Sequence, residues 1–568
     1  MKASDLFVKC LEREGVTHIF GLPGEENADV MMSLTESKIR FVLCRHEQAA
    51  AFMADAYGRL TGKPGVCLGT LGPGATNLIT GVADANMDRA PVICIVGQAD
   101  TERLHKESHQ NMDSVSMFKP VTKWSTTTHH PDNIPEIVRK AFKIATTEKP
   151  GAVLIELPED LVKAQTTSKP LNPIVTRRPG ADHKAIAQAV EAIESAKKPM
   201  IIAGNGAIRK RAATQLQRLA ENTGIGVVNT FMGKGAVPRT DPHCLFTLGL
   251  QGKDHILAAL HDADVILSVG YDLVEYSPKF WNTGRRKKII HIDFWPAEVD
   301  EDYVEWVDIQ ADIADALWQI NEALEAKYKK APKKKGKKKA KAKGKRTLPL
   351  FDIGTRAKLR QTIQEDLEAE GDDASFPMKP QKVLYDVRSF LGAEDILLSD
   401  VGAHKMWVAR YYQCDEPNTC LISNGFCSMG FAFPGSIGAK IAFPKRRVLS
   451  INGDAGFFLN SQDIETACRL KINVVAMIWM DGEYGLIKWK QQNQFGGKHS
   501  ELAFNNPDLE LWAKSYGAWG RTIEGPDELM PALEVAFRQK GPAVIGVPID
   551  YAENRKLTKR LGNLQWSI

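Results

Sequence analysis

Two acidic residues follow consecutive apolar runs in the last third of the chain. Asp454 comes just after residues 447–452, and Asp481 comes just after residues 472–479. Each run has the length and character of a buried strand, and a helix-like stretch separates them. This order predicts parallel strands whose ends meet at one edge of a sheet, where ligands bind in α/β proteins. Two carboxylates at that edge are hard oxygen ligands of the kind that Mg²⁺ prefers.

The residues around these acids suit a phosphate beside the metal. Gly453, Ala455 and Gly456 are small, so backbone N–H groups and a helix N-terminus can approach a phosphate closely. The glycine-containing loop after Asp481 can add a carbonyl ligand. The alternative is structural: Asp454 would be a turn or capping residue, and Asp481 would belong to a turn.

A third acidic residue stands in a very different setting near the start of the chain. Glu47 lies in the segment 44–59, which is rich in Ala and also contains Phe52 and Met53. Taken alone, a glutamate on such a helix is more often a solvated surface residue. If the apolar side chains bury it, it becomes a carboxylate that faces a desolvated pocket.

Asp454 and Asp481 are 27 residues apart, with loop, helix and strand between them, and this arrangement resembles the magnesium–diphosphate motif of thiamine-diphosphate enzymes. Two positions depart from the family pattern: Ala455 replaces a usual Gly, and Asp481 replaces a common Asn. Alanine is a modest steric change and aspartate remains a hard ligand, so neither departure removes the site. Segment 44–59 resembles the helix that carries the family's conserved glutamate.

The resemblance extends in order along nearly the whole chain. Segments 21–24 and 69–77 are similar to the pyrimidine-side loops, and segments 400–404 and 423–430 are similar to the diphosphate-side loops. It implies that Glu47 shares a proton with the aminopyrimidine ring and that Met429 wedges between the two rings of the cofactor. The residues that it assigns to thiamine diphosphate are Pro23, Glu47, Thr70, Asn77, Gly402, Ala403, His404, Gly425, Met429, Gly453, Asp454, Ala455, Gly456, Asp481, Glu483, Tyr484 and Gly485, and those assigned to Mg²⁺ are Asp454, Asp481 and Glu483.

Further stretches, 108–110 with 117–123 after it and 270–281, are similar to the acetolactate synthase branch of the family, in its catabolic, FAD-independent form. Flavin-containing members carry an Arg where Asp272 falls, which argues against bound FAD. The implied reaction decarboxylates pyruvate and joins the remaining two-carbon unit to a second pyruvate, giving 2-acetolactate and CO₂. Glu47 is the expected catalytic group, and His109 and Gln110 are candidates for hydrogen bonds to the substrate.

Other outcomes stay open at this point. A related enzyme could be another 2-oxo acid decarboxylase or carboligase, or a pyruvate oxidase. Outside the enzymes, the alternative is a silent cofactor-binding or assembly protein, although the retention of Glu47, Asp454 and Asp481 argues against it. The resemblance also implies a homodimer or homotetramer whose active sites lie at the subunit interface. The number of subunits and any regulatory subunit are not determined by the sequence.

Composition excludes several classes of protein. Hydrophobic residues make up 43% and charged residues 25%, as in soluble globular proteins, and no apolar run approaches a membrane span. The net charge is +5, but residues 327–346 alone carry 13 Lys or Arg and no acids, so the remainder carries −8. The basic character therefore belongs to one segment, which indicates a solvated tether and no nucleic-acid-binding face, and the alternative for this segment is nuclear targeting or polyanion binding. Nine scattered cysteines without a metal-binding spacing predict reduced thiols and a cytoplasmic protein.

Apolar runs that alternate with helix-like stretches predict the fold. The expectation is an α/β protein with three doubly wound parallel-sheet domains: a pyrimidine-binding domain at 1–165, a central domain at 184–326 and a diphosphate- and Mg²⁺-binding domain at 375–550. A lysine-rich linker is predicted at 327–350. The first and third domains share a rhythm but show no residue-by-residue repeat.

Overall fold

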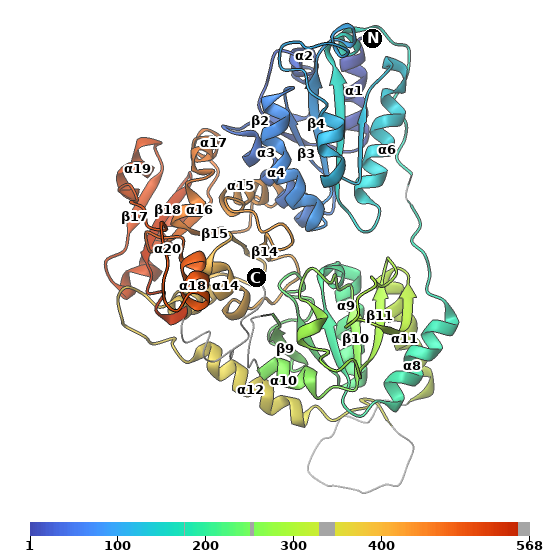
Figure 1. Ribbon diagram of the computed structural model, residues 1–568, viewed down its shortest axis with the longest axis vertical. Coiled ribbons are helices and arrows are strands. Elements are labelled where there is room, and N and C mark those ends of the chain that lie inside the picture. The colour runs from blue at the N-terminus through green and yellow to red at the C-terminus, as the bar shows by residue number, and fades with distance from the viewer. Residues whose placement is uncertain (175, 250–254, 329–346, 555–568) are drawn as a thin grey trace, which may run out of the picture.

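The computed structural model describes residues 1–174, 176–249, 255–328 and 347–554. They form three α/β domains, each built on a six-stranded sheet in which every pairing between strands is parallel. Figure 1 shows the first domain in blue, the central domain in green and the third domain in orange to red. The predicted fold class is confirmed. Most of the lysine-rich segment, residues 329–346, lies outside the described residues.

The first domain has the strand order β2-β1-β3-β4-β6-β5. Its strands are β1 (His18–Gly21), β2 (Arg40–Leu43), β3 (Gly65–Gly69), β4 (Val92–Gln98), β5 (Trp124–Thr127) and β6 (Ala152–Pro158). Its helices are α1 (Ala3–Arg13), α2 (Ala28–Thr35), α3 (Glu47–Thr61), α4 (Pro73–Met87), α5 (Ser114–Phe118), α6 (Ile134–Thr146) and α7 (Glu159–Lys163).

The third domain repeats this order as β14-β13-β15-β16-β18-β17, so the shared rhythm of the two segments reflects one topology. Its strands are β13 (Ile396–Ser399), β14 (Cys420–Ile422), β15 (Val448–Gly453), β16 (Val475–Met480), β17 (Trp519–Thr522) and β18 (Ala543–Pro548). Its helices are α13 (Pro380–Phe390), α14 (Ala403–Tyr411), α15 (Ala432–Ala442), α16 (Asp454–Phe457), α17 (Ile464–Leu470), α18 (Gly485–Gln494), α19 (Leu509–Ser515) and α20 (Leu529–Phe537).

The central domain differs, with the order β12-β11-β10-β7-β8-β9. Counted within the domain, this is the 3-2-1-4-5-6 order of dinucleotide-binding folds, read from the other edge. Its strands are β7 (Met200–Ala203), β8 (Gly226–Asn229), β9 (Cys244–Thr247), β10 (Val265–Val269), β11 (Lys288–Asp293) and β12 (Glu305–Gln310). Its helices are α8 (His183–Ser195), α9 (Lys210–Thr223), α10 (His255–His261) and α11 (Ile313–Lys327), and α12 (Gly354–Glu368), which the sequence did not predict, leads on to the third domain.

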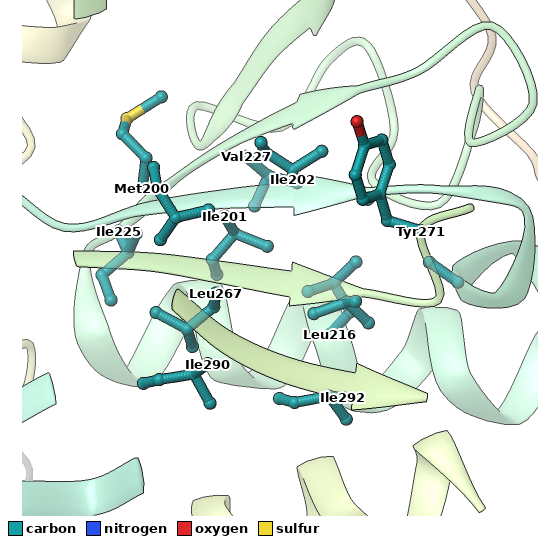
Figure 2. Packing of buried hydrophobic residues seen from close by; sticks show 14 of the residues in the cluster. Met200, Ile201, Ile202, Leu216, Ile225, Val227, Leu267, Tyr271, Ile290 and Ile292 are labelled. Atoms are coloured by element: carbon teal, nitrogen blue, oxygen red, sulfur yellow. The ribbon is translucent and has the colours of Figure 1, made fainter. Parts of the chain in front are cut away.

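Strands that are buried on both faces explain why the sequence shows continuous apolar runs instead of alternating apolar and polar residues. Ile201 and Ile202 on β7 are both fully buried, although consecutive strand residues point to opposite faces. Figure 2 shows how they pack with Leu216 of α9 and with residues of the neighbouring strands. Helices cover both faces of such a sheet, so both faces need apolar residues.

The first and third domains share one hydrophobic core, in which α3 packs against α15. The two helices approach closely, because a Cβ added at Gly438 would lie 2.2 Å from the carbonyl oxygen of Met53. Phe52 and Phe431 meet edge to face with ring centroids 5.7 Å apart. This contact fixes the third domain against the first within one chain.

Candidate functional site

The first group of acidic residues lies at the switch point of the third sheet. At a switch point the chain leaves two neighbouring strands in opposite directions. Asp454 is 1% exposed and begins α16 directly after β15. Its Oδ2 accepts hydrogen bonds from the backbone N–H groups of Asp481, at 3.1 Å, and Gly482, at 2.8 Å. The same oxygen accepts one from Asn506 Nδ2 at 2.7 Å. The strands β15 and β16 are parallel neighbours, which brings the two acids together as predicted.

The electrostatics of this pair favour a cation. Burial and the nearby charge of Asp454 raise the pKa of Asp481 to about 7. A divalent cation would stabilise the ionised form of Asp481 and so oppose both burial and the charge of Asp454. Asn506 adds a side-chain oxygen, Oδ1, that is buried and has no hydrogen-bond partner among the described residues. No group of three or more His, Cys, Asp or Glu side chains fit for a metal occurs in the described ranges, so a metal here would take its remaining ligands from other oxygens.

A buried histidine lies beside β15, the strand that leads to Asp454. His404 is 2% exposed, and its buried Nε2 has no hydrogen-bond partner in the part of the chain that the structure describes. Burial lowers the pKa of His404 to about 3, so the ring is neutral near pH 7. Gly402 and Gly453 line the ring. A Cβ added at Gly402 would lie 2.7 Å from His404 Cε1, and one added at Gly453 would lie 3.1 Å from the same atom. Gly402 directly precedes Ala403 at the start of α14, and Gly453 ends β15, so both lie beside a helix N-terminus whose N–H groups suit an anion.

The loop at residues 423–430 is held from both sides. Asp88, at the end of α4 in the first domain, accepts hydrogen bonds from the N–H groups of Asn424 and Gly425 at 2.8 and 2.7 Å. Asp400 accepts one from Gly430 N–H at 2.9 Å, and burial raises its pKa to about 7. Half-buried Met429 therefore sits on a firmly positioned loop.

The first domain carries the second acidic group, at the switch point of its own sheet. Glu47 begins α3 and is 8% exposed, and its Oε2 accepts a hydrogen bond from Asn77 Nδ2 at 2.9 Å. Gly74 is beside it: a Cβ there would lie 2.9 Å from Thr70 Cγ2 and 3.6 Å from Glu47 Oε1. Thr70 in turn donates to the buried Glu26 at 2.7 Å, a contact that the sequence did not suggest. Glu47, Thr70 and Asn77 thus form one cluster, with exposed Pro23 on the adjoining loop.

Other predicted residues lie at the margins of these clusters. Ala455 donates its N–H to Asp454 Oδ1 at 2.9 Å, and Gly485 is so close to Asp481 that a Cβ would lie 2.6 Å from its Oδ2. The site also includes Gly456, where a Cβ would lie 2.8 Å from an oxygen of Asp400, and the exposed Tyr484.

The side chain of Glu483 already has a partner within the protein. Its carboxylate forms an ion pair with Lys488, and its carbonyl oxygen accepts a hydrogen bond from Gly485 N–H at 2.9 Å. As a metal ligand it stays a prediction. The carbonyl oxygen is the atom better placed to serve, since the side chain is already paired.

The two substrate-side candidates lie in the first domain, between β4 and α5. His109 and Gln110 are both exposed. A Cβ at Gly72, at the start of α4, would lie 2.9 Å from the carbonyl oxygen of Gln110. Gln110 has a φ of 55°, an uncommon conformation for a residue with a side chain. The structure therefore places Gln110 on the Glu47 side of the molecule.

One chain keeps the two acidic groups separate. Among the described residues, no hydrogen bond or ion pair joins Glu47, Thr70 or Asn77 to Asp454 or Asp481. Each group lies at the carboxyl edge of its own sheet.

The switch point of the central sheet is filled by the protein itself. Asn205 follows β7 and donates its N–H to Glu275 at 3.0 Å. Glu275 also accepts from the N–H of Asp272 at 3.0 Å and from the Thr230 hydroxyl. Burial, with a smaller contribution from the charge of Asp272, raises the pKa of Glu275 to about 8. Asp272 itself forms ion pairs with Lys149 and Arg89 of the first domain.

Comparison with known protein families assigns all three domains. The model of the thiamine pyrophosphate enzyme N-terminal TPP binding domain matches residues 1–117, the central-domain model matches 186–320, and the C-terminal TPP binding domain model matches 400–547. This chain belongs to the thiamine pyrophosphate enzymes. The cofactor that both matched binding domains take, thiamine diphosphate, is the one the sequence predicted.

Relatives of this thiamine pyrophosphate enzyme match it from end to end. Acetolactate synthase of Bacillus subtilis (strain 168) is 34% identical over 572 residues, covering 99% of this chain and 96% of the relative. The catabolic acetolactate synthase of Raoultella terrigena is 34% identical, covering 98% and 97%. A probable acetolactate synthase large subunit of Methanocaldococcus jannaschii is also 34% identical, covering 97% and 93%. The predicted resemblance to the acetolactate synthase branch is confirmed.

Two other features bear on earlier predictions. All nine cysteines are free, as the sequence predicted. No helix in the described residues is long and apolar enough to cross a membrane.

Proposed function

We propose that this thiamine pyrophosphate enzyme is a carboligase that joins two molecules of pyruvate into 2-acetolactate with release of CO₂. The observation that carries the proposal is the match of nearly the whole chain to proteins named acetolactate synthase. Retention of Glu47 and Asp454 in buried, hydrogen-bonded positions supports an active enzyme over a silent cofactor-binding protein.

The residues of the third domain fit Mg²⁺ and a diphosphate. Asp454 and Asp481 supply two carboxylates, and the unpartnered Asn506 Oδ1 is a further oxygen that the sequence did not identify. The buried ring nitrogen of His404 and the N-terminus of α14 would face the diphosphate. When bound, thiamine diphosphate supplies a nucleophilic carbon and accepts the electron pair left as the 2-oxo acid loses CO₂.

Glu47 holds and moves a proton in this proposal. Asn77 donates to Oε2, which fixes the carboxyl group and leaves Oε1 as the atom that exchanges a proton with the cofactor's pyrimidine ring. Thr70 and Gly74 crowd the same face, and the low exposure of Glu47 keeps bulk water from competing for the proton. His109 and Gln110 are proposed to contact the substrate from the exposed side.

We also propose that the enzyme works without FAD, although its central domain has the strand order of a dinucleotide-binding fold. The backbone N–H of Asn205 could bind a phosphate at the switch point, but it already donates to the carboxylate of Glu275. Asp272 adds negative charge there. Purified protein should therefore show no flavin absorbance and need no added FAD, and a stoichiometric flavin spectrum would contradict this.

The active site is proposed to form between two copies of the chain. Glu47 and Asp454 lie in separate groups within one chain, and the proposed chemistry needs both at one cofactor. A homodimer, or a homotetramer made of two such dimers, would bring the Glu47 group of one copy to the Asp454 group of another.

Product analysis tests the proposed reaction. The purified chain is incubated with thiamine diphosphate, Mg²⁺ and pyruvate, and products are identified by NMR. We expect 2-acetolactate and CO₂ in equal amounts. Acetaldehyde would instead identify a decarboxylase, acetate or acetyl phosphate an oxidase, and absence of pyruvate consumption would contradict the proposal.

A further inference from the structure

A buried lysine lies between the loops at residues 400–404 and 423–430, and among the described residues it has no acidic partner. Lys405 is 6% exposed and occupies the first turn of α14, where its N–H donates to the carbonyl of Gly402 at 3.2 Å. Its Nζ reaches across to the loop 423–430 and contacts Cys427 Sγ at 3.1 Å. Within the described part of the chain, Lys405 takes part in no ion pair.

This arrangement leaves the charge of Lys405 poorly compensated. A thiol is a weak hydrogen-bond acceptor, and an ammonium group has three donors to satisfy. Removing such a charge from water is costly unless an anion accompanies it. Cys427 Sγ lies 2.8 Å from the carbonyl oxygen of Asn424, so the thiol is tied to its own loop and serves to hold the lysine in place.

The position of Lys405 indicates which anion would complete the site. The loops that leave β13 and β14 emerge at one edge of the sheet, since these strands are parallel neighbours. Lys405 spans both loops at the start of α14, where the helix dipole also favours negative charge. The unpartnered Nε2 of the adjacent His404 is a second buried group at this start that lacks a ligand.

We propose that Lys405 is a further cofactor-binding residue, whose ammonium group, held by Cys427, pairs with the diphosphate of the cofactor. The inference rests on the proposed function, because it takes the loops at residues 400–404 and 423–430 as the diphosphate side. It adds a charged ligand that the sequence analysis did not assign.

Titration calorimetry with thiamine diphosphate in the presence of Mg²⁺ tests the proposal. Lys405→Gln keeps most of the side-chain length and removes the charge, so we expect the Kd to rise at least about tenfold, as for loss of a charge-assisted hydrogen bond. Lys405→Arg should restore the affinity to within about threefold. As a matched control, Lys440→Gln removes a half-buried lysine at the far end of α15 and should leave the Kd unchanged.

A second measurement distinguishes an effect on cofactor binding from an effect on substrate binding. At saturating cofactor, Lys405→Gln should keep the KM for pyruvate within about twofold of the wild type, because a residue that binds the diphosphate does not contact the substrate carboxylate. A raised KM with an unchanged Kd for thiamine diphosphate would overturn the proposal. If the wild type binds no thiamine diphosphate, the proposed function itself fails. If the wild type and Lys405→Gln bind it equally, only the role of Lys405 fails.

Alkylation of the unmodified protein gives an independent test that does not depend on a variant folding. Cys427 is exposed, whereas Cys468 is half-buried in α17 and serves as the internal control. Thiamine diphosphate with Mg²⁺, and inorganic pyrophosphate with Mg²⁺, should each slow the reaction of Cys427 with iodoacetamide and leave Cys468 unaffected. Peptide mass spectrometry measures both rates. An unchanged rate at Cys427 would contradict the proposal.

Discussion

The third and central domains use the same kind of sheet edge in opposite ways. Both are six-stranded parallel sheets, and in both the chain turns away from two neighbouring strands at a switch point. In the third domain this edge gathers Asp454 and Asp481, together with the buried and unpartnered His404 Nε2. In the central domain the corresponding turn donates to the carboxylate of Glu275.

The difference teaches that a dinucleotide-type strand order does not by itself make a nucleotide site. The backbone donors at a switch point attract an anion, and either a ligand or the chain can supply it. In the central domain the chain itself supplies the hydrogen-bond acceptor, because the carboxyl group of Glu275 accepts from Asn205 N–H, and burial is the main cause that raises the pKa of Glu275 to about 8. The third domain leaves its polar groups for a ligand.

The largest effect, a loss of cofactor binding, should come from a substitution at the carboxyl edge of the third-domain sheet. Asp454→Ala removes the carboxylate that links the loops after β15 and β16, so the diphosphate loses its Mg²⁺ bridge and cofactor retention should be abolished. Asp481→Asn is the matched control and should have a mild effect, because asparagine keeps an oxygen ligand. Calorimetric titration measures both, and an unchanged affinity in Asp454→Ala would refute the metal site.

A smaller effect is expected at the first-domain edge. Glu47→Gln keeps the shape and the contact with Asn77 but cannot exchange a proton, so turnover should fall about 10²- to 10⁴-fold while the cofactor still binds. Exposed Glu36→Gln, at the end of α2, is the control and should behave as the wild type. Steady-state kinetics and cofactor titration measure the two effects. Wild-type turnover in Glu47→Gln would show that Glu47 has no part in proton transfer.

The smallest effect is expected at the switch point of the central-domain sheet. It is a change in how the free energy of unfolding depends on pH. Burial and the charge of Asp272 raise the pKa of Glu275 from its ordinary 4.5 to about 8. The folded state therefore loses stability relative to the unfolded state as pH rises from about 4.5 to 8. Glu275→Gln lacks this loss and keeps an acceptor for Asn205 N–H.

Chemical denaturation at a series of pH values tests this. The free energy of unfolding of Glu275→Gln should gain on the wild type as pH rises, with no further gain above about pH 8. A difference that does not vary with pH would mean that Glu275 is already ionised in the folded state at low pH. The variant should still show no flavin, because Asp272 keeps its ion pairs with Lys149 and Arg89.

Local patterns predicted much of this molecule. The strands before Asp454 and Asp481 and the helix that begins at Glu47 were predictable, because apolar runs and helix starts depend on nearby residues. By residue type Asn460 and Asp463 suit helix caps, but their side chains reach the Gly430 carbonyl and the Arg45 N–H instead.

Contacts between distant segments could not be predicted. Asn506 lies 52 residues beyond Asp454 in a loop with no periodic pattern, yet it donates directly to that carboxylate. Glu275 reaches Asn205 from a separate loop, and Lys405 reaches Cys427 across two strand ends. Such contacts depend on how loops pack at a sheet edge, which no local signal in the sequence records.

Mixing two inactive variants tests most directly whether Glu47 and Asp454 serve one cofactor from two copies of the chain. Glu47→Gln and Asp454→Ala proteins are combined under conditions that allow chains to exchange, and exchange is verified by native mass spectrometry. A hybrid dimer contains one site with both residues intact and one with neither. The account predicts that activity with pyruvate returns well above the sum of the two separate variants. Confirmed exchange without any return of activity would contradict it.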